Sequence, residues 1–168
     1  MLVAAPRIKD QNFKFAVVYL IKHDARGAIG LIVNRKVGVG SFSEMLADLG
    51  RSTDEDHQID LYFGGPISHR KVFVLHSSDF SAYGTITSSV GISMTGSISI
   101  IDAIVSGNAP QQMRFMMGYA GWAAGQLKQE LERGDWLHAA ADEALIFGLG
   151  GQTEEVWRQA YKKAGLTL

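Results

Sequence analysis

One stretch of this chain decides its fold: MRFMMGYAGWAAGQLKQELERG, residues 113–134. The part from Met113 to Trp122 has the pattern of a strand. Beyond it, side chains repeat at the four-residue spacing of a helix at Gln126, Leu127, Glu130 and Leu131. Gly134 then ends this helix, because glycine readily takes the left-handed conformation found after a helix C-terminus. The stretch therefore predicts a strand that runs into a helix.

Gln126 and Glu130 share one face of that predicted helix. Two interpretations follow: the pair reaches a common ligand, or it braces the adjacent strand. We favour the brace, because most buried polar side chains serve to satisfy one another and the backbone.

Upstream, two apolar runs predict a hairpin, 15–21 paired with 28–35 around the turn 24–27. Apolar residues occupy both faces of the first run, which is typical of a strand covered on both sides. Gly30 inside the second run indicates a bulge or the close approach of another backbone.

The middle of the chain alternates short elements with glycine-containing turns. Ser41 and Glu44 form a capping box that opens a helix ending near Gly50. Strands are predicted next at 60–63 and 71–76, on either side of the bend Gly64-Gly65-Pro66, followed by a hairpin of 85–88 with 91–94.

The segment 97–106 fits either a buried strand or a helix that ends at Gly107, and the helix is favoured. The remaining elements are a strand at 136–140, a short helix at 142–147 and an amphipathic helix capped by Thr153. Helices and hairpins without a β-α-β alternation indicate an α+β fold, in one domain spanning 1–168.

Composition and charge exclude several classes of function. The 168 residues include no cysteine, so disulfides, cysteine-based zinc sites and thiol nucleophiles are absent. Sixteen basic and 17 acidic residues give a net charge of −1, without the basic stripe of a duplex-binding protein. With no helix-turn-helix pattern either, no direct specific DNA binding is expected.

The longest apolar run, 15–21, is too short to cross a bilayer, and the apolar start 1–6 is too short for a signal peptide. We therefore expect a cytoplasmic protein with no membrane association.

Signatures of catalysis and of metal binding are missing as well. There is no P-loop and no nucleophile elbow, and the five histidines lack metal-ligand spacing. We assign no catalytic residue and expect neither a metal nor a cofactor. His76 with Ser77 does not form a Ser-His pair, because neighbours along a strand point to opposite faces.

Five blocks, in order along nearly the whole chain, resemble the bacterial AlgH family. They are Pro6–Asp10 with Phe13; the hairpin through Gly27, Gly30 and Asn34-Arg35; Gly64-Gly65-Pro66; Phe73–His76; and Gly118–Trp122 with Gly125-Gln126-Leu127. The chain departs from the family pattern at Lys36, where proline is usual, and at Lys128, where an acidic residue is common.

The resemblance implies a bent, largely antiparallel sheet closed into a pseudo-barrel with surrounding helices, and a helix at 97–106. The resemblance implies little about activity. The family looks like a set of cytosolic bacterial proteins that are often labelled transcriptional regulators, from a genetic link to alginate control, and that have no settled biochemical function.

The leading functional hypothesis is a non-enzymatic regulatory or binding module, which acts on a small molecule or a protein partner through a surface cleft. The residues predicted to line this cleft are Asn34, Arg35, His76, Tyr119, Trp122 and Gln126. A second set is predicted to shape the backbone around it: Gly64, Gly65, Pro66, Gly118, Gly121, Gly125 and Glu130. The alternative is a small hydrolase or transferase with His76 as general base, assisted by Glu130 or Asp10.

Overall fold

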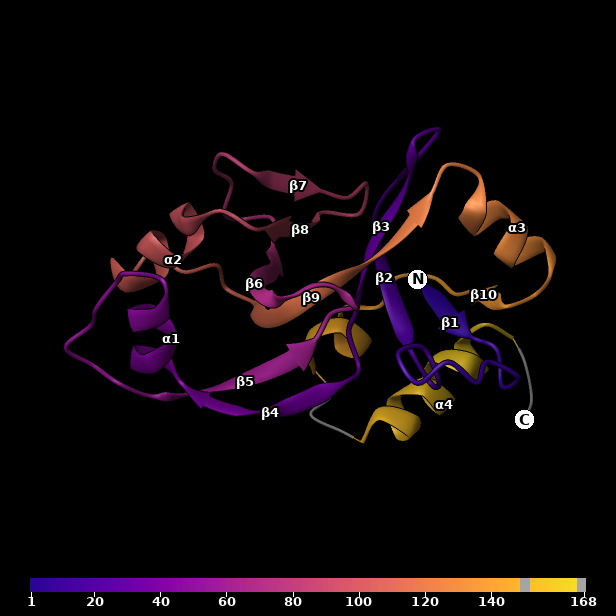
Figure 1. The fold of residues 1–168 in the computed structure, drawn as a ribbon, viewed down its shortest axis with the longest axis horizontal. Helices are drawn as coiled ribbons and strands as arrows, with labels where there is room; N and C mark the ends of the chain where they lie inside the picture. The colour runs from indigo at the N-terminus through magenta and orange to yellow at the C-terminus, as the bar shows by residue number, and fades with distance from the viewer. Residues whose placement is uncertain (149–151, 166–168) are drawn as a thin grey trace.

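The computed structural model describes residues 1–148 and 152–165 (Figure 1). The elements, in chain order, are β1 (Leu2–Ala4), β2 (Val17–Asp24), β3 (Gly27–Ile32), β4 (Lys36–Ser41), α1 (Phe42–Asp48), β5 (Gln58–Phe63), β6 (Ile67–Ser77), β7 (Thr85–Thr87), β8 (Ile92–Thr95), α2 (Ile98–Val105), β9 (Met113–Ala123), α3 (Gln126–Glu132), β10 (Trp136–His138), the π-helix η1 (Ala144–Gly148) and α4 (Thr153–Lys163). The strands form one sheet of ten within the described residues.

The long strand β9 is the axis of this sheet, and it runs diagonally across Figure 1. One edge of β9 pairs with β6. The other edge is shared: Phe115–Met117 pair in parallel with β5, and Ala120–Ala123 pair antiparallel with β3. The sheet therefore forks along β9, with β5 and β4 on one branch and β3, β2, β1 and β10 on the other.

The backbone at the fork is bonded to both branches. Gly64 donates its N–H to the carbonyl of Met117 at 2.8 Å and accepts from the N–H of Ile32 at 2.9 Å. Gly118 follows in β9 with a φ of 71°, a left-handed conformation that suits glycine. The change of pairing partner on β9 thus coincides with the predicted glycine bend.

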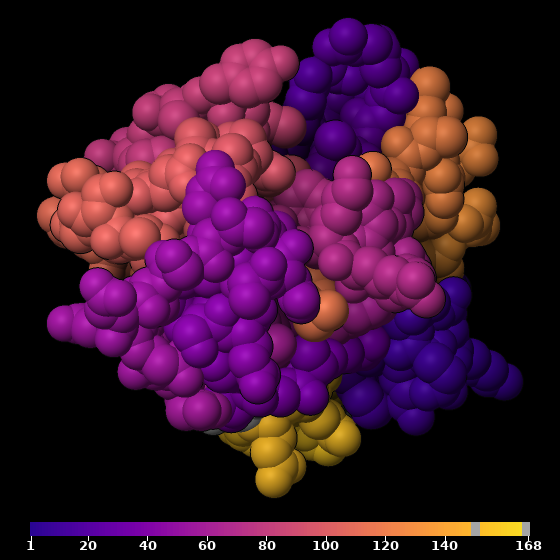
Figure 2. Space-filling model, turned by 60° about the vertical axis from the view of Figure 1, so that its left-hand side comes forward, coloured from indigo at the N-terminus to yellow at the C-terminus, as the bar shows by residue number. Residues whose placement is uncertain are grey.

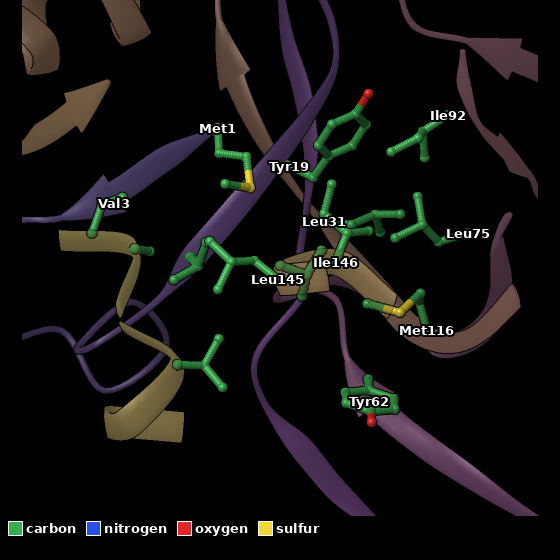
Figure 3. Close-up of a cluster of buried hydrophobic side chains, with 14 of the residues drawn as sticks. Met1, Val3, Tyr19, Leu31, Tyr62, Leu75, Ile92, Met116, Leu145 and Ile146 are labelled. Atoms are coloured by element: carbon green, nitrogen blue, oxygen red, sulfur yellow. The ribbon is translucent and has the colours of Figure 1, made fainter. Parts of the chain in front are cut away.

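Helices cover the two faces of the curled sheet (Figure 1). On one face, η1 and α4 close a core that includes Tyr19, Leu31, Leu75 and Met116, and Figure 3 shows Leu145 and Ile146 of η1 inserted there. On the other face, Leu127 of α3 packs with Leu2, Ala120 and Trp136. A third cluster, of Phe42, Leu46, Val74, Ile100 and Phe115, joins α1 and α2 to β6 and β9.

Most predicted elements are confirmed. The segment 97–106 is the helix α2, and the first hairpin has its turn between Asp24 and Gly27. Its first strand is buried on both faces, and the pairing shifts register between Leu20 and Lys22, beside Gly30. The predicted α+β class, with a bent and largely antiparallel sheet, is also confirmed.

Four details differ from the sequence-based expectations. The strands β1 and β4 were not predicted, because three residues in one case and a glycine-rich segment in the other carry little pattern of their own. The short helix at 142–147 is a π-helix shifted to Ala144–Gly148. Thr153 is the first residue of α4 and not its cap, since Gln152 holds the N-cap position.

Among the described residues, no helix has both the length and the apolar character needed to cross a bilayer.

Candidate functional site

A groove of about 550 Å³ lies between α1 and β6. Figure 2 looks onto this side, where the purple surface of 36–56 meets the magenta surface of β6 and a small orange area of β9 is exposed between them. The side chains that form its apolar floor are Met45, Leu49, Leu61, Val72 and Met117. Four of these also pack on the cluster beneath α1 and α2, so the floor of the groove is the outer side of a hydrophobic core.

The two walls of the groove carry opposite charges. Glu44 and Asp48 lie one helical turn apart on α1, and Arg70 and Lys71 lie on β6. All four side chains are exposed, and none of them forms an ion pair with another residue in 1–148 or 152–165. Because exposed charges without internal partners are available to a ligand, both walls can contact an occupant of the groove.

Contacts at both ends hold α1 in place. At its start, Ser41 Oγ accepts from the N–H of Glu44 at 3.1 Å, as the capping box predicted. Asp56 accepts from the N–H of Ser43 and from Ser41 Oγ, and the first of these bonds lowers the pKa of its carboxyl. Beyond its C-terminus, Arg51 forms a two-point ion pair with Asp102 of α2, at 2.5 and 3.2 Å.

The opposite wall is built on a bulge in β6. Ile67 pairs with Tyr119 and Val72 pairs with Met117, so four residues of β6 lie opposite a single residue of β9. The extra residues turn away from the ladder through Ser68, which has a φ of 51°. Bulges commonly redirect side chains at the rim of a sheet. This one places Arg70 and Lys71 at the groove.

A second hollow of about 460 Å³ lies next to the groove, on the other side of Met117. Met117 lines both, and the second hollow adds Val37, Phe63, Pro66 and His69. The combined surface is thus elongated along β5 and β6.

The structure places Asn34 and Arg35 against the loop that precedes β2. Asn34 is 3% exposed; its Oδ1 accepts from the N–H of Val17, and its Nδ2 donates to the carbonyls of Phe15 and Thr153, each at 2.8 Å. The guanidinium of Arg35 donates to three carbonyls, those of Gln11, Asn12 and Lys14. Both side chains use their polar atoms to hold the fold together.

His76 is fully buried, at 0% exposure. Its Nδ1 lies 2.8 Å from the carbonyl oxygen of Ser77 and its Nε2 lies 2.8 Å from Oγ1 of Thr95. A carbonyl only accepts, so Nδ1 carries the proton and Nε2 accepts from the threonine hydroxyl. Burial lowers the pKa of this histidine, although the carbonyl of Ser77 and the charge of Asp79 act in the opposite direction.

Trp122, Gln126 and Glu130 meet where β9 joins α3. The indole N–H groups of Trp122 and Trp136 both donate to Glu130 Oε2 at 2.8 Å. Gln126 donates from Nε2 to Glu130 Oε1 and accepts from the N–H of Ala123. This is the geometry of the brace favoured by the sequence.

The six predicted cleft residues therefore do not converge. Tyr119 packs edge-on against Phe73, and it lies six residues along β9 from Met113, the residue that pairs with His76. Asn34 contacts the loop before β2 and the start of α4 instead. Of the six, Trp122 lines a small hollow of about 150 Å³ near Arg26, and none lines the groove between α1 and β6. The groove residues were missed by sequence reasoning, although the four-residue spacing of Glu44 and Asp48 and the adjacent cations Arg70-Lys71 were visible in the sequence.

The structure thus defines an α+β protein on a curled, half-barrel sheet. The family model described as AlgH-like matches residues 1–168, and the chain belongs to this family, as the resemblance indicated.

Individual relatives cover nearly the whole chain. A UPF0301 protein of Methylococcus capsulatus is 42% identical over 167 residues, which are 99% of this chain and 91% of the relative. The solution structure of the AlgH protein from Pseudomonas aeruginosa matches with a TM-score of 0.82 at 36% identity, covering 99% of this chain and 87% of that one. A crystal structure from Corynebacterium diphtheriae, with a TM-score of 0.72 at 23% identity over 96% and 83% of the two chains, shares the fold.

Proposed function

We propose that this protein is a non-enzymatic binding module whose groove between α1 and β6 holds a segment of a partner protein. The observation that carries the proposal is an apolar floor between an acidic wall and a basic wall whose charges have no internal partners in the described residues. Binding sites commonly combine apolar contact area with a few charged groups that fix orientation.

The length of the surface favours a peptide segment over a small molecule. The groove and the hollow beyond Met117 lie next to each other along two strands, and each contains apolar side chains together with polar ones. An extended or helical segment with apolar side chains would cover this floor. Its own basic residues would face Glu44 and Asp48, and its acidic residues would face Arg70 and Lys71. The flexible side chains of Met45 and Met117 allow the floor to adapt to such a segment.

The geometry does not favour the hydrolase or transferase alternative. A general base must reach the proton that it abstracts, but His76 is buried and both of its ring nitrogens are engaged. Glu130 is occupied by two indoles and an amide. Among the described residues, no histidine lines the groove between α1 and β6, and His69 lines the second hollow without a carboxylate beside it in that lining.

Site-specific photo-crosslinking tests the proposal. A benzophenone amino acid in place of Lys71, expressed in the source cell, should form a discrete protein adduct. The same amino acid in place of Lys128, exposed on α3, is the matched control and should not form it.

Charge reversal then separates specific docking from chance proximity. Asp48→Lys should lower the yield of the adduct at position 71 severalfold, because it replaces one of the two negative charges of the acidic wall with a positive charge. Lys128→Glu should leave the yield unchanged. Equal adducts at positions 71 and 128, or an adduct insensitive to Asp48→Lys, would refute the groove as the docking site. A small molecule retained by the purified protein in native mass spectrometry, and lost in the Asp48→Lys variant, would refute the peptide as occupant.

A further inference from the structure

A separate hollow of about 310 Å³ opens at the start of β9, beside β5 and η1. It is lined by His57, Gln58, Ile59, Asp60, Tyr62, Met113, Arg114, Phe115 and Phe147. A neighbouring hollow of about 530 Å³ shares Met113 and Phe147 with it, so the space continues along η1. None of these residues belongs to the groove between α1 and β6.

Arg114 is the unusual member of this lining. Its side chain comes from the middle of the sheet and is 6% exposed. Nη1 donates to the carbonyl of Val33 at 2.6 Å, and the guanidinium lies over the ring of Tyr62, 4.3 Å from its centroid. Within the described residues no carboxylate forms an ion pair with it; Asp60 pairs with Lys36 at 2.7 Å.

Among residues 1–148 and 152–165, no carboxylate lies within ion-pair distance of this buried arginine. Removing a charge from water is costly, and buried charges are normally paired. A guanidinium has five N–H donors, and the carbonyl of Val33 takes one of them. Burial also lowers the pKa of Arg114, because desolvation opposes its charge, although Tyr62 and the carboxylate of Asp60 act in the opposite direction. An anion in the adjoining hollow would offset that cost.

The π-helix η1 supplies the facing wall. Leu145 and Ile146 are buried in the core, as Figure 3 shows, and they anchor this short helix. Phe147 and Ala144 are left to line the two hollows. π-Helical turns are rare and occur frequently at functional sites.

We infer that this hollow binds a small organic carboxylate, with its carboxylate group against the Arg114 guanidinium and its apolar body among Met113, Phe115 and Phe147. The planar guanidinium fork matches a carboxylate in a two-point contact. The lining combines the apolar side chains of Met113, Phe115 and Phe147 with polar ones that include the Asp60 carboxylate. This negative charge disfavours a multiply charged phosphate more than a singly charged carboxylate. The inference is independent of the groove, because it rests on different residues.

A pair of isosteric probes tests this inference on the intact protein. Benzoate and benzamide have nearly the same shape, but only benzoate is an anion. Benzoate should shift the side-chain Nε–H resonance of Arg114 and the backbone resonances of Phe115 and Phe147 in a saturable way, with a Kd of about 1 mM or lower. It should also raise the melting temperature through ligand linkage. Benzamide at the same concentrations should do neither.

Variants locate the binding. Arg114→Met should weaken benzoate binding at least tenfold, and Arg158→Gln, on the surface of α4, should leave it unchanged. If Arg114→Met fails to fold, benzoate binding by Phe147→Ala tests the inference instead. Loss of the aromatic wall should weaken that binding severalfold. Three outcomes would each overturn the inference: equal responses to benzoate and benzamide, no saturable response, or benzoate-induced resonance shifts that do not include the Nε–H of Arg114.

Discussion

Gly64 and Gly118 face each other so closely at the fork of the sheet that a Cβ atom on Gly64 would lie 2.2 Å from the carbonyl oxygen of Gly118. A Cβ on Gly118 would in turn lie 2.3 Å from the carbonyl oxygen of Gly65 and 2.9 Å from the Cα of His69. The bulge of β6 therefore folds over Gly118 in direct backbone contact. The same contact positions Arg70 and Lys71 at the groove, because both follow His69 in that bulge.

Replacement of Gly64 by alanine should strongly destabilise the protein. The added methyl group meets backbone on the opposite strand, so the fork has to separate, and we expect a loss of about 3 kcal/mol or more in the free energy of unfolding. Gly38→Ala in β4 is the matched control: a Cβ there has no neighbour within 4 Å, and the variant should stay within about 0.5 kcal/mol of wild type. Urea unfolding measures both, and similar midpoints for the two variants would contradict the prediction.

Asn34 joins β3 to the start of β2 and to α4 through its amide group. In Asn34→Asp, the NH₂ that donates to the carbonyls of Phe15 and Thr153 becomes a carboxylate oxygen facing them. We expect a loss of about 2 kcal/mol or more, since two acceptors lose their donor in a buried site. Asn108→Asp, at an exposed position after α2, should change stability little. Equal urea midpoints for the two variants would show that the buried amide is dispensable.

Glu130 receives hydrogen bonds from two indoles and one amide. Glu130→Gln keeps the size of the side chain but leaves one acceptor oxygen for three donors. The expected loss is about 1–3 kcal/mol, with shifts in the Nε1–H resonances of both Trp122 and Trp136. Glu132→Gln, on the exposed face of α3, is the control and should move neither resonance. If the Nε1–H resonances of both tryptophans are unchanged in Glu130→Gln, Glu130 does not accept their hydrogen bonds and the brace is refuted.

The elements that were predicted correctly are those whose signals come from residues close together in the sequence. The Ser41 cap of α1, the hairpin turn at 24–27 and the strand-to-helix passage at 113–134 all depend on residues close together in the chain, and all three are present. Of the predicted capping box, the bond from the Glu44 N–H to Ser41 Oγ is found. The strand Leu2–Ala4 was missed because its pairing partners lie around residues 17 and 137. Three residues show no period, and long-range pairing decides their conformation.

The predicted site failed to come together for a related reason. Asn34, His76 and Gln126 were selected as polar residues that a core would not need. In the structure their polar atoms satisfy carbonyls, hydroxyls and N–H groups of their own chain. Sequence alone does not distinguish a polar side chain that holds the fold from one that awaits a ligand. Arg114 shows the reverse case. Its burial beside a hollow, without an ion pair to any residue that the structure describes, follows from the placement of β9 beside β5 and η1 and not from local sequence.

His76 should make the stability of the protein depend on pH in mildly acidic solution. Burial lowers its pKa in the folded state below the ordinary value of 6.5. The unfolded chain therefore takes up a proton first as the pH falls, and stability is lost from about pH 6.5 down towards the folded-state pKa. One proton contributes a slope of at most about 1.4 kcal/mol per pH unit.

Urea unfolding between pH 7.5 and 5.5 measures this slope. The variant His76→Gln has no group that titrates at this position, so the part of the slope due to His76 should disappear, although its stability at pH 7.5 should be lower because Thr95 and the carbonyl of Ser77 lose an ideal partner. His69→Gln, at an exposed position of β6, should keep the wild-type slope. A slope that survives in His76→Gln would mean that another group controls the acid stability of the fold.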